Sequence, residues 1–284
     1  MEANRPIYKT RIGASQLIAS AFFLTPLILG QAIAFFIDET FFWSAGLLTL
    51  TCGLGLYLCV VCGNAYTEHC QRTDMHQSPK ILPTGTFAAL MVTGAGLYLA
   101  FYLDRPLIFP LTAICLALFW AYHFPPLQLA MRGGGEILQA LGFGLLLPLI
   151  GYYAQTGNWR PLPQTLLMPY ILLQLATAIA YALPNREADI ARSKKTWSVL
   201  LGNRTAAALA VAACLGAQYQ LVWSRGLPTL LVGLMLIPVA ALLAAAPLHH
   251  RLDDSFFHQC VFKNIVFSAG YIYALGFSLA QLWN

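Results

Sequence analysis

Long apolar runs alternate with short polar segments along the whole chain. Nine of these runs approach or exceed the roughly 20 residues that a helix needs to cross a bilayer. Within each run the apolar residues lie all round, as in helices that face lipid or the core of a bundle. The runs lie at 14–37, 43–63, 86–103, 106–122, 136–154, 165–183, 204–223, 227–248 and 260–282. The pattern predicts an all-α integral membrane protein with about nine transmembrane helices.

Composition agrees with this pattern. Of the 284 residues, 58% are hydrophobic and only 10% are charged, and the mean hydropathy is +0.65. No linker-like or low-complexity stretch divides the chain, so we expect one polytopic membrane domain over residues 1–284. The net charge of +5 is a basic excess that membrane loops alone explain. We therefore expect membrane lipid as a partner and no nucleic acid.

The basic residues are distributed unevenly between the two sides of the predicted membrane domain. If the N-terminus is cytoplasmic, 13 of the 16 Lys and Arg residues fall on the inside. The three on the outside are Arg105, Arg160 and Arg225. Because cytoplasmic loops of membrane proteins are enriched in Lys and Arg, this bias predicts a cytoplasmic N-terminus. The polar loops on that side are also the longer ones, so we expect the chemistry to lie there.

The second apolar run ends in the polar sequence GNAYTEHCQRTD, residues 63–74. Asn64 and Glu68 are four residues apart and would share one face if the helix continues to about residue 70. Asp74 could fold back toward them from a turn. Oxygen ligands of this kind suit Mg²⁺, which takes one or two carboxylates together with water and substrate phosphate oxygens. The alternative is a solvated helix end, which accommodates any polar residue.

A second polar segment, LPNREADIARSKKTWSVLLGNRT, spans residues 183–205. Asn185 and Asp189 repeat the four-residue spacing of an amide and a carboxylate. Three cations follow within two turns, namely Arg192, Lys194 and Lys195. Such a segment can hold a metal and an anion together. An ordinary positively charged loop would explain the cations but not the amide–carboxylate pair.

A third segment carries three glycines at 133–135 between Arg132 and Glu136. The glycines let the backbone pass close to a neighbour, and Arg132 could clamp a phosphate. Glu136 falls in the first turn of the fifth predicted helix, where a carboxylate suits the helix dipole. A plain loop with an N-terminal acid is the alternative. A Walker P-loop is excluded, because no Gly-Lys-Ser or Gly-Lys-Thr follows the glycines.

The first two segments are more informative together than apart, because both lie at the cytoplasmic end of a long predicted helix. Carboxylates, amides and cations converging above an apolar bundle fit a diphosphate bridged by Mg²⁺ better than a neutral solute. The bundle below could then accept a long hydrocarbon tail.

These residues resemble the UbiA superfamily of intramembrane aromatic prenyltransferases, and most closely its menaquinone branch, the 1,4-dihydroxy-2-naphthoate polyprenyltransferases. That branch has a first motif N-D-x-x-D-x-x-x-G-x-D, with which residues 64–74 align without a gap. Its second motif, D-x-x-x-D-x-x-x-G-K-x-T, aligns with residues 185–196. Residues 125–157, ending in Tyr-Tyr-Ala-Gln-Thr-Gly, are similar to the stretch between its fourth and fifth helices. The resemblance thus covers most of the chain.

The chain departs from both motifs. Ala65 stands where the first motif usually has Asp, Glu68 replaces an Asp, and Arg72 replaces the Gly. In the second motif, Asn185 replaces the first Asp and Ser193 the Gly. An amide can still offer a neutral carbonyl to Mg²⁺, but it supplies no charge.

The resemblance implies Mg²⁺-dependent transfer of a polyprenyl group from polyprenyl diphosphate to an aromatic quinone precursor, in the bacterial inner membrane with the active-site loops cytoplasmic. The expected catalytic residues are Glu68, Asp74 and Asp189, which with Asn185 would also hold the metal. We expect the diphosphate to be bound by Asn64, Arg72, Arg132, Asn185, Arg192, Lys194 and Lys195. The expected aromatic walls of the prenyl pocket are Tyr66, Tyr122 and Tyr181.

Two other functions are compatible with the same residues. The substituted motifs would suit a diverged, non-catalytic membrane protein that binds isoprenoid or quinone lipids. Polar groups within a membrane domain also mark the substrate paths of transporters. The chain shows no internal repeat and no matching pair of broken helices, which disfavours a transporter.

Overall fold

The computed structural model describes residues 14–38, 40–71, 81–158, 164–183 and 185–225, and within these ranges every regular element is helical. Seven of the nine predicted runs fall in this part of the chain, and each coincides with one long helical stretch. The runs at 227–248 and 260–282 lie outside the described residues, so the number of about nine stays a prediction. The long single helices are α1 (Ala14–Asp38), α2 (Trp43–Gln71), α3 (Ile81–Phe101), α4 (Ile108–His123), α8 (Gln164–Ala182) and α11 (Asn203–Arg225).

The fifth long stretch is one rod made of three elements. Helix α6 (Gly135–Leu141) continues through a π-helical turn, η1 (Gly142–Leu146), into α7 (Leu147–Thr156). Pro148 lies in the first turn of α7 and has no N–H to donate to the preceding turn. We attribute the wider turn at η1 to this missing donor, because irregular helical turns form where the regular bonding pattern is interrupted.

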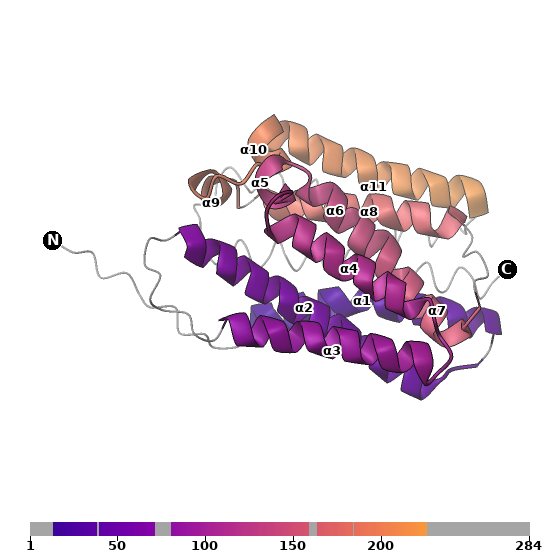
Figure 1. The fold of residues 1–284 in the computed structure, drawn as a ribbon. Coiled ribbons are helices and arrows are strands. Elements are labelled where there is room, and N and C mark those ends of the chain that lie inside the picture. Colours follow the sequence, from indigo (N-terminus) through magenta and orange to yellow (C-terminus); the bar gives the residue numbers. More distant parts are fainter. Residues whose placement is uncertain (1–13, 39, 72–80, 159–163, 184, 226–284) are drawn as a thin grey trace.

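Three short helices lie in the polar loops, where the hydropathy pattern gave no sign of them. They are α5 (Leu129–Arg132), α9 (Arg186–Ala191) and α10 (Trp197–Leu201). Figure 1 shows all three at one end of the bundle, the end at which α2 finishes and α11 begins. The polar segments of the sequence therefore gather at a single end of the molecule.

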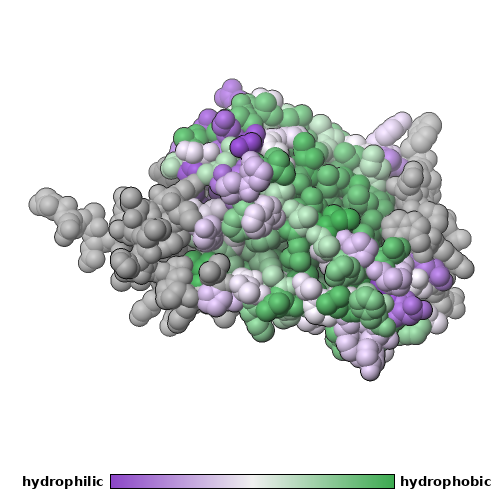
Figure 2. Space-filling view, in the orientation of Figure 1, coloured by the Kyte–Doolittle hydropathy of each residue, from purple (hydrophilic) through white to green (hydrophobic). Residues whose placement is uncertain are grey.

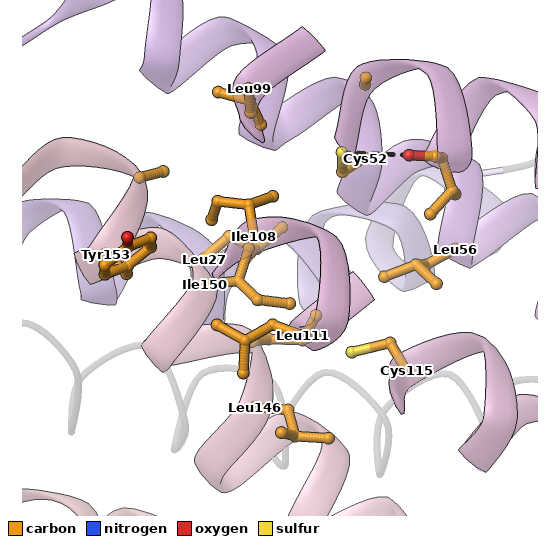
Figure 3. Packing of buried hydrophobic residues seen from close by; sticks show 14 of the residues in the cluster. Leu27, Cys52, Leu56, Leu99, Ile108, Leu111, Cys115, Leu146, Ile150 and Tyr153 are labelled. Carbon is orange, nitrogen blue, oxygen red and sulfur yellow. Dashed lines mark hydrogen bonds between the residues drawn. The ribbon is translucent and has the colours of Figure 1, made fainter. Parts of the chain in front are cut away.

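Two apolar cores hold the bundle together, and α1 contributes to both. On one side, Leu29 and Ile33 of α1 pack with Tyr170 and Ile179 of α8 and with residues of α11. The other core joins α1 to α2, α3, α4 and α7 (Figure 3); its most buried members include Leu27, Cys52, Leu99, Ile108 and Ile150. The thiol of Cys52 donates a hydrogen bond to the Val92 carbonyl at 3.8 Å.

Helices α1 and α7 approach each other at their backbones. A Cβ atom on Gly30 would overlap the carbonyl oxygen of Pro148, and one on Gly151 would overlap the carbonyl of Leu27. Only glycine fits such a contact, because it leaves no side chain between the helices. This pair of helices joins the two cores.

Three helices of the described chain are long and apolar enough to cross a membrane: Trp43–Thr67, Pro83–Phe101 and Gly135–Thr156. Shorter apolar helices lie at Phe23–Phe35, Ile108–His123 and Leu167–Ala182. Figure 2 shows apolar residues across the middle of one face, with hydrophilic residues toward both ends, one of which carries α9. Length, composition and surface therefore agree with an integral membrane protein.

Candidate functional site

The second motif forms a compact turn after α8. The four-residue spacing suggested that Asn185 and Asp189 continue the long helix α8. Helix α8 instead ends at Ala182, before both residues. Asn185 is instead the N-cap of α9, and its amide Nδ2 donates to the Tyr181 carbonyl at 2.9 Å. Asp189 is 7% exposed, and its Oδ2 accepts a hydrogen bond from the Thr196 hydroxyl at 3.2 Å.

Helix α9 ends in a complete Schellman motif, the pair of hydrogen bonds that closes many helices. The Lys194 N–H donates to the Asp189 carbonyl at 2.9 Å, and the Ser193 N–H donates to the Ile190 carbonyl at 3.0 Å. Ser193, the first residue after the C-cap Arg192, has a φ of +56°. This is the position at which the related motif has Gly, so the left-handed backbone explains that preference. The motif places Lys194 next to the Asp189 backbone.

Burial and the neighbouring cations shift the pKa of the Asp189 carboxyl in opposite directions. Burial raises its pKa above the ordinary value, while Lys194, the Thr196 hydroxyl and Arg192 each lower it. A buried carboxylate of this kind gains from an added positive charge, because a cation offsets the loss of hydration. Asp189 is therefore suited to hold a metal ion or a second cationic group.

The third segment supports the second motif. The Glu136 carboxylate, 4% exposed, accepts the backbone N–H of Trp197 at 2.6 Å. The Trp197 indole N–H donates to the Gly133 carbonyl at 3.2 Å. Glu136 lies in the first turn of α6, as the sequence predicted. The sequence predicted that this carboxylate interacts with the N-terminus of its own helix. It instead accepts the first N–H of α10, a different helix.

The first motif continues α2 as a helix to Gln71, as the spacing required. Asn64 lies on this extension, and its side-chain oxygen is 3.3 Å from Nε2 of His123 on α4. Glu68 lies in the same helix, but its side chain is not among the described parts of the chain. Arg72 and Asp74 lie outside the described residues. The convergence of these three side chains with Asn64 thus stays a prediction.

Residues of α4 connect Asn64, the described end of the first motif, with the second motif. The Lys194 ammonium acts electrostatically on His123, which contacts Asn64. Tyr122, the neighbour of His123, likewise interacts with both Glu136 and Asp189. The amide end of the first motif and the carboxylate of the second are therefore linked by His123 and Lys194. The sequence did not single out His123, because a lone imidazole at the end of an apolar run is ordinary in a core.

The other expected site residues are more exposed. Arg132 ends α5 with an exposed side chain, Lys195 is exposed, and Arg192 is partly buried. Tyr66 packs on Phe124 with ring centroids 5.6 Å apart.

The aromatic residues of the expected pocket come from three helices. Tyr122 is half-buried against Gly135, and Tyr181 of α8 interacts electrostatically with Tyr57 of α2. Tyr57, which the sequence did not single out, also packs edge-on against Phe23 of α1 at 5.7 Å. Aromatic rings from α1, α2, α4 and α8 thus lie on the bundle side of the polar end.

The donor atoms here fit a divalent cation that is shared with a substrate. No group of three or more His, Cys, Asp and Glu side chains capable of holding a metal occurs in the part of the chain that is described. Asp189 supplies a carboxylate, and the Asn185 bond to Tyr181 uses the amide nitrogen and not its oxygen. Because Mg²⁺ commonly takes one or two carboxylates and completes its shell with water and phosphate oxygens, this set fits Mg²⁺ bound with a diphosphate.

Comparison with known proteins agrees with this geometry. The profile of the UbiA prenyltransferase family matches residues 78–262. The chain belongs to the UbiA prenyltransferase family. The match includes the second motif, the glycine segment and the helices α3 to α11, and it starts after the first motif.

Two relatives of this UbiA family member are informative. A 1,4-dihydroxy-2-naphthoate octaprenyltransferase of Mycobacterium leprae (strain TN) is 26% identical over 193 residues, which cover 63% of this chain and 65% of that protein. The apo structure of a UbiA homolog from Aeropyrum pernix K1 is similar in fold, with a TM-score of 0.63 at 14% identity. That similarity covers 94% of this chain and 98% of the other. The expected UbiA fold is thereby confirmed, and the first of these relatives, a dihydroxynaphthoate octaprenyltransferase, is similar to this chain in sequence.

Proposed function

We propose that this UbiA family member transfers a polyprenyl group from polyprenyl diphosphate to an aromatic quinone precursor, with Mg²⁺ as cofactor. The observation that carries the proposal is the arrangement of Asn64, His123, Lys194 and Asp189 at one end of an apolar bundle. Groups that could bind an anion and a cation occur together at this end, and Tyr66 and Tyr122 belong to the same two helices as Asn64 and His123. The similarity to a dihydroxynaphthoate octaprenyltransferase supports a dihydroxynaphthoate-like acceptor.

In this proposal the chain binds the diphosphate and stabilises its departure. Lys194, with Lys195, Arg192, Arg72 and Arg132, would neutralise the charge that grows on the leaving diphosphate. Asp189, Glu68 and Asp74, with the Asn185 carbonyl, would hold Mg²⁺. That ion supplies Lewis-acid stabilisation of the leaving group when it is bound.

The organic part of the reaction would take place among the aromatic side chains. As the allylic C–O bond breaks, the electron pair leaves with the diphosphate. The developing allylic cation is attacked by an electron-rich carbon of the acceptor ring, which then loses a proton. Tyr122, Tyr181 and Tyr66 would stabilise the cation through their ring faces.

The membrane arrangement is part of the proposal. We place the protein in the bacterial inner membrane, with about nine transmembrane helices, a cytoplasmic N-terminus and the polar end on the cytoplasmic side. The charge bias of the loops and the gathering of α5, α9 and α10 at one end of the bundle (Figure 1) support this arrangement. Cysteine accessibility on the two sides of sealed vesicles tests it.

The decisive experiment is release of pyrophosphate by purified protein in lipid, given Mg²⁺, a polyprenyl diphosphate and 1,4-dihydroxy-2-naphthoate. We expect prenylated product in amounts equal to the pyrophosphate. Asp189→Ala and Glu68→Ala should each lower turnover by about a hundredfold or more, the range seen when a group that stabilises developing charge is removed. Both variants should still insert in the membrane. Full activity in both would remove these residues from the site.

A diverged lipid-binding protein without catalysis is the second candidate. It is favoured by one observation: Asn185, where the related motif has Asp, donates its amide to a backbone carbonyl and adds no charge. Two outcomes together would identify this function: retained binding of polyprenyl diphosphate, and no turnover with any aromatic acceptor. The variant Asn185→Asp would then be expected to restore part of the cation affinity.

A further inference from the structure

His123 is a buried histidine at the end of α4, with 2% of its surface exposed. Its Nδ1 lies 3.1 Å from the carbonyl oxygen of Phe119, one turn earlier in the same helix. Its Nε2 lies 3.3 Å from the side-chain oxygen Oδ1 of Asn64 on α2, as the amide is placed in the structure. The imidazole therefore connects the backbone of α4 to the first residue of the first motif.

The ring is held in place on several sides. A Cβ atom on Gly63 would lie 2.8 Å from His123 Cδ2, so only glycine leaves room for the imidazole there. The rings of Phe119 and Tyr122 have centroids 4.6 Å and 4.7 Å from that of His123. Rotation of the ring would require these neighbours to move, so its two nitrogens keep the partners described above.

Hydrogen-bond accounting then determines the tautomer. A backbone carbonyl only accepts, so the contact with Phe119 requires the hydrogen on Nδ1. In a neutral imidazole Nε2 is then an acceptor and needs an N–H from Asn64. A second ring proton would give the imidazole a positive charge near the Lys194 ammonium, and the two like charges would repel each other. The neutral ring is therefore favoured.

A side-chain amide satisfies this requirement by turning through 180° about its last bond, which exchanges its oxygen and nitrogen and moves no other group. We propose that His123 is a positioning residue: Nε2 accepts a hydrogen bond from the Asn64 amide nitrogen, which makes the Asn64 carbonyl oxygen the end presented to a ligand between the motifs. The ligand side of this inference rests on the proposed function, whereas the tautomer and the amide orientation do not.

The consequence for the site is chemical. A carbonyl oxygen can join the shell of a divalent cation, whereas an amide NH₂ group in the same place would repel one. Without His123 the amide is free to present either end. Loss of His123 should therefore weaken the binding of the metal–diphosphate pair and leave a fully bound substrate to react nearly normally.

The first test is ¹⁵N NMR of protein labelled in its histidine rings, in detergent and without ligand. Comparison with His123→Phe assigns the signals of this one of the six histidines. We expect a protonated Nδ1 and an unprotonated Nε2. A protonated Nε2 would overturn the proposal whether or not the protein is a prenyltransferase.

The second test measures binding of Mg²⁺ with inorganic pyrophosphate, and separately KM and kcat for the polyprenyl diphosphate. We expect His123→Phe to weaken binding and raise KM about tenfold, with kcat within about twofold, which is the size expected of one hydrogen bond that orients a ligand group. His123→Gln, whose side-chain oxygen can accept from Asn64, should recover part of the loss. Trp120→Phe, an exposed ring on the same helix, is the matched control and should bind as the wild type does.

A double-mutant cycle separates positioning from packing. If His123 acts through Asn64, His123→Phe should have no further effect on pyrophosphate binding in the Asn64→Ala background. An equal loss in both backgrounds would show a general packing role and overturn the proposal. Failure of the wild type to bind pyrophosphate at all would instead count against the proposed function, with the NMR result still deciding the tautomer.

Discussion

Glu136 and Trp197 are 61 residues apart in the chain, yet the Glu136 carboxylate accepts the Trp197 backbone N–H at 2.6 Å. This bond attaches α10 to the start of the fifth long helix. Thr196, the residue before Trp197, donates to the Asp189 carboxylate. The position of Asp189 therefore depends on a carboxylate that belongs to neither motif.

Replacement of Glu136 should consequently impair the site without a direct role in chemistry. We expect Glu136→Ala to lower turnover about ten- to a hundredfold, since a hydrogen bond to a charged group is worth about 1.5–3 kcal/mol. Glu136→Gln, which keeps an acceptor oxygen, should lose less. Ile137→Ala, at an exposed neighbouring position, serves as control in the same pyrophosphate-release assay. Equal activity of Glu136→Ala and the control would contradict this role.

Ser193 offers a test of the backbone independent of catalysis. Its φ of +56° is costly for a residue with a Cβ atom, and both Schellman bonds around it remain possible with glycine. Ser193→Gly should therefore stabilise the protein by about 1 kcal/mol, the strain relieved exceeding the added chain entropy. Thermal unfolding in detergent measures this, with Ser193→Ala as the variant that keeps the strain. A lower Tm for Ser193→Gly than for Ser193→Ala would refute the assignment.

Arg132 should act on substrate binding more than on the chemical step. It lies exposed at the end of α5, next to the glycine segment whose backbone contacts Trp197. We expect Arg132→Glu to raise KM for the polyprenyl diphosphate about tenfold or more, because a charge-assisted contact to phosphate becomes a repulsion. Glu187→Arg, at an exposed position on α9, controls for a general change of surface charge. If KM is unchanged in Arg132→Glu, this residue lies outside the diphosphate site.

Removal of divalent cations should abolish turnover reversibly. The described part of the site holds one buried carboxylate of the second motif and cannot by itself enclose a metal. The ion should therefore bind weakly alone and tightly with the diphosphate, which completes its shell. Calorimetry with Mg²⁺, in the presence and absence of pyrophosphate, measures the difference, and EDTA followed by added Mg²⁺ tests reversibility. Equal Mg²⁺ affinity in both conditions would argue for a preformed protein site.

Much of the fold could be predicted from hydropathy, because a transmembrane helix must be apolar over its whole length. The run at 43–63 was expected to be a helix, and its continuation to about residue 70 was the condition for Asn64 and Glu68 to share a face; α2 spans Trp43–Gln71. The short helices α9 and α10 could not be predicted in this way. They are stabilised by specific hydrogen bonds, such as that from Glu136, which leave no periodic pattern.

The sequence could single out candidate site residues by their type, but it could not predict how they are connected. Asn64 and Asp189 could be selected because an amide or a carboxylate at the end of an apolar helix requires an explanation. His123 could not, since a single histidine in an aromatic stretch is ordinary in a core. Its importance comes from the place where α4 meets α2, at Gly63, which only the three-dimensional arrangement reveals.

The contact of α1 with α7 bears on how a lipid would reach the interior. At Gly30 and Gly151 the two backbones are in direct contact, with no side chain between them. Parting these helices would also disrupt both apolar cores, because α1 contributes to each. We therefore expect a substrate that diffuses within the bilayer to enter between another pair of helices and not between α1 and α7.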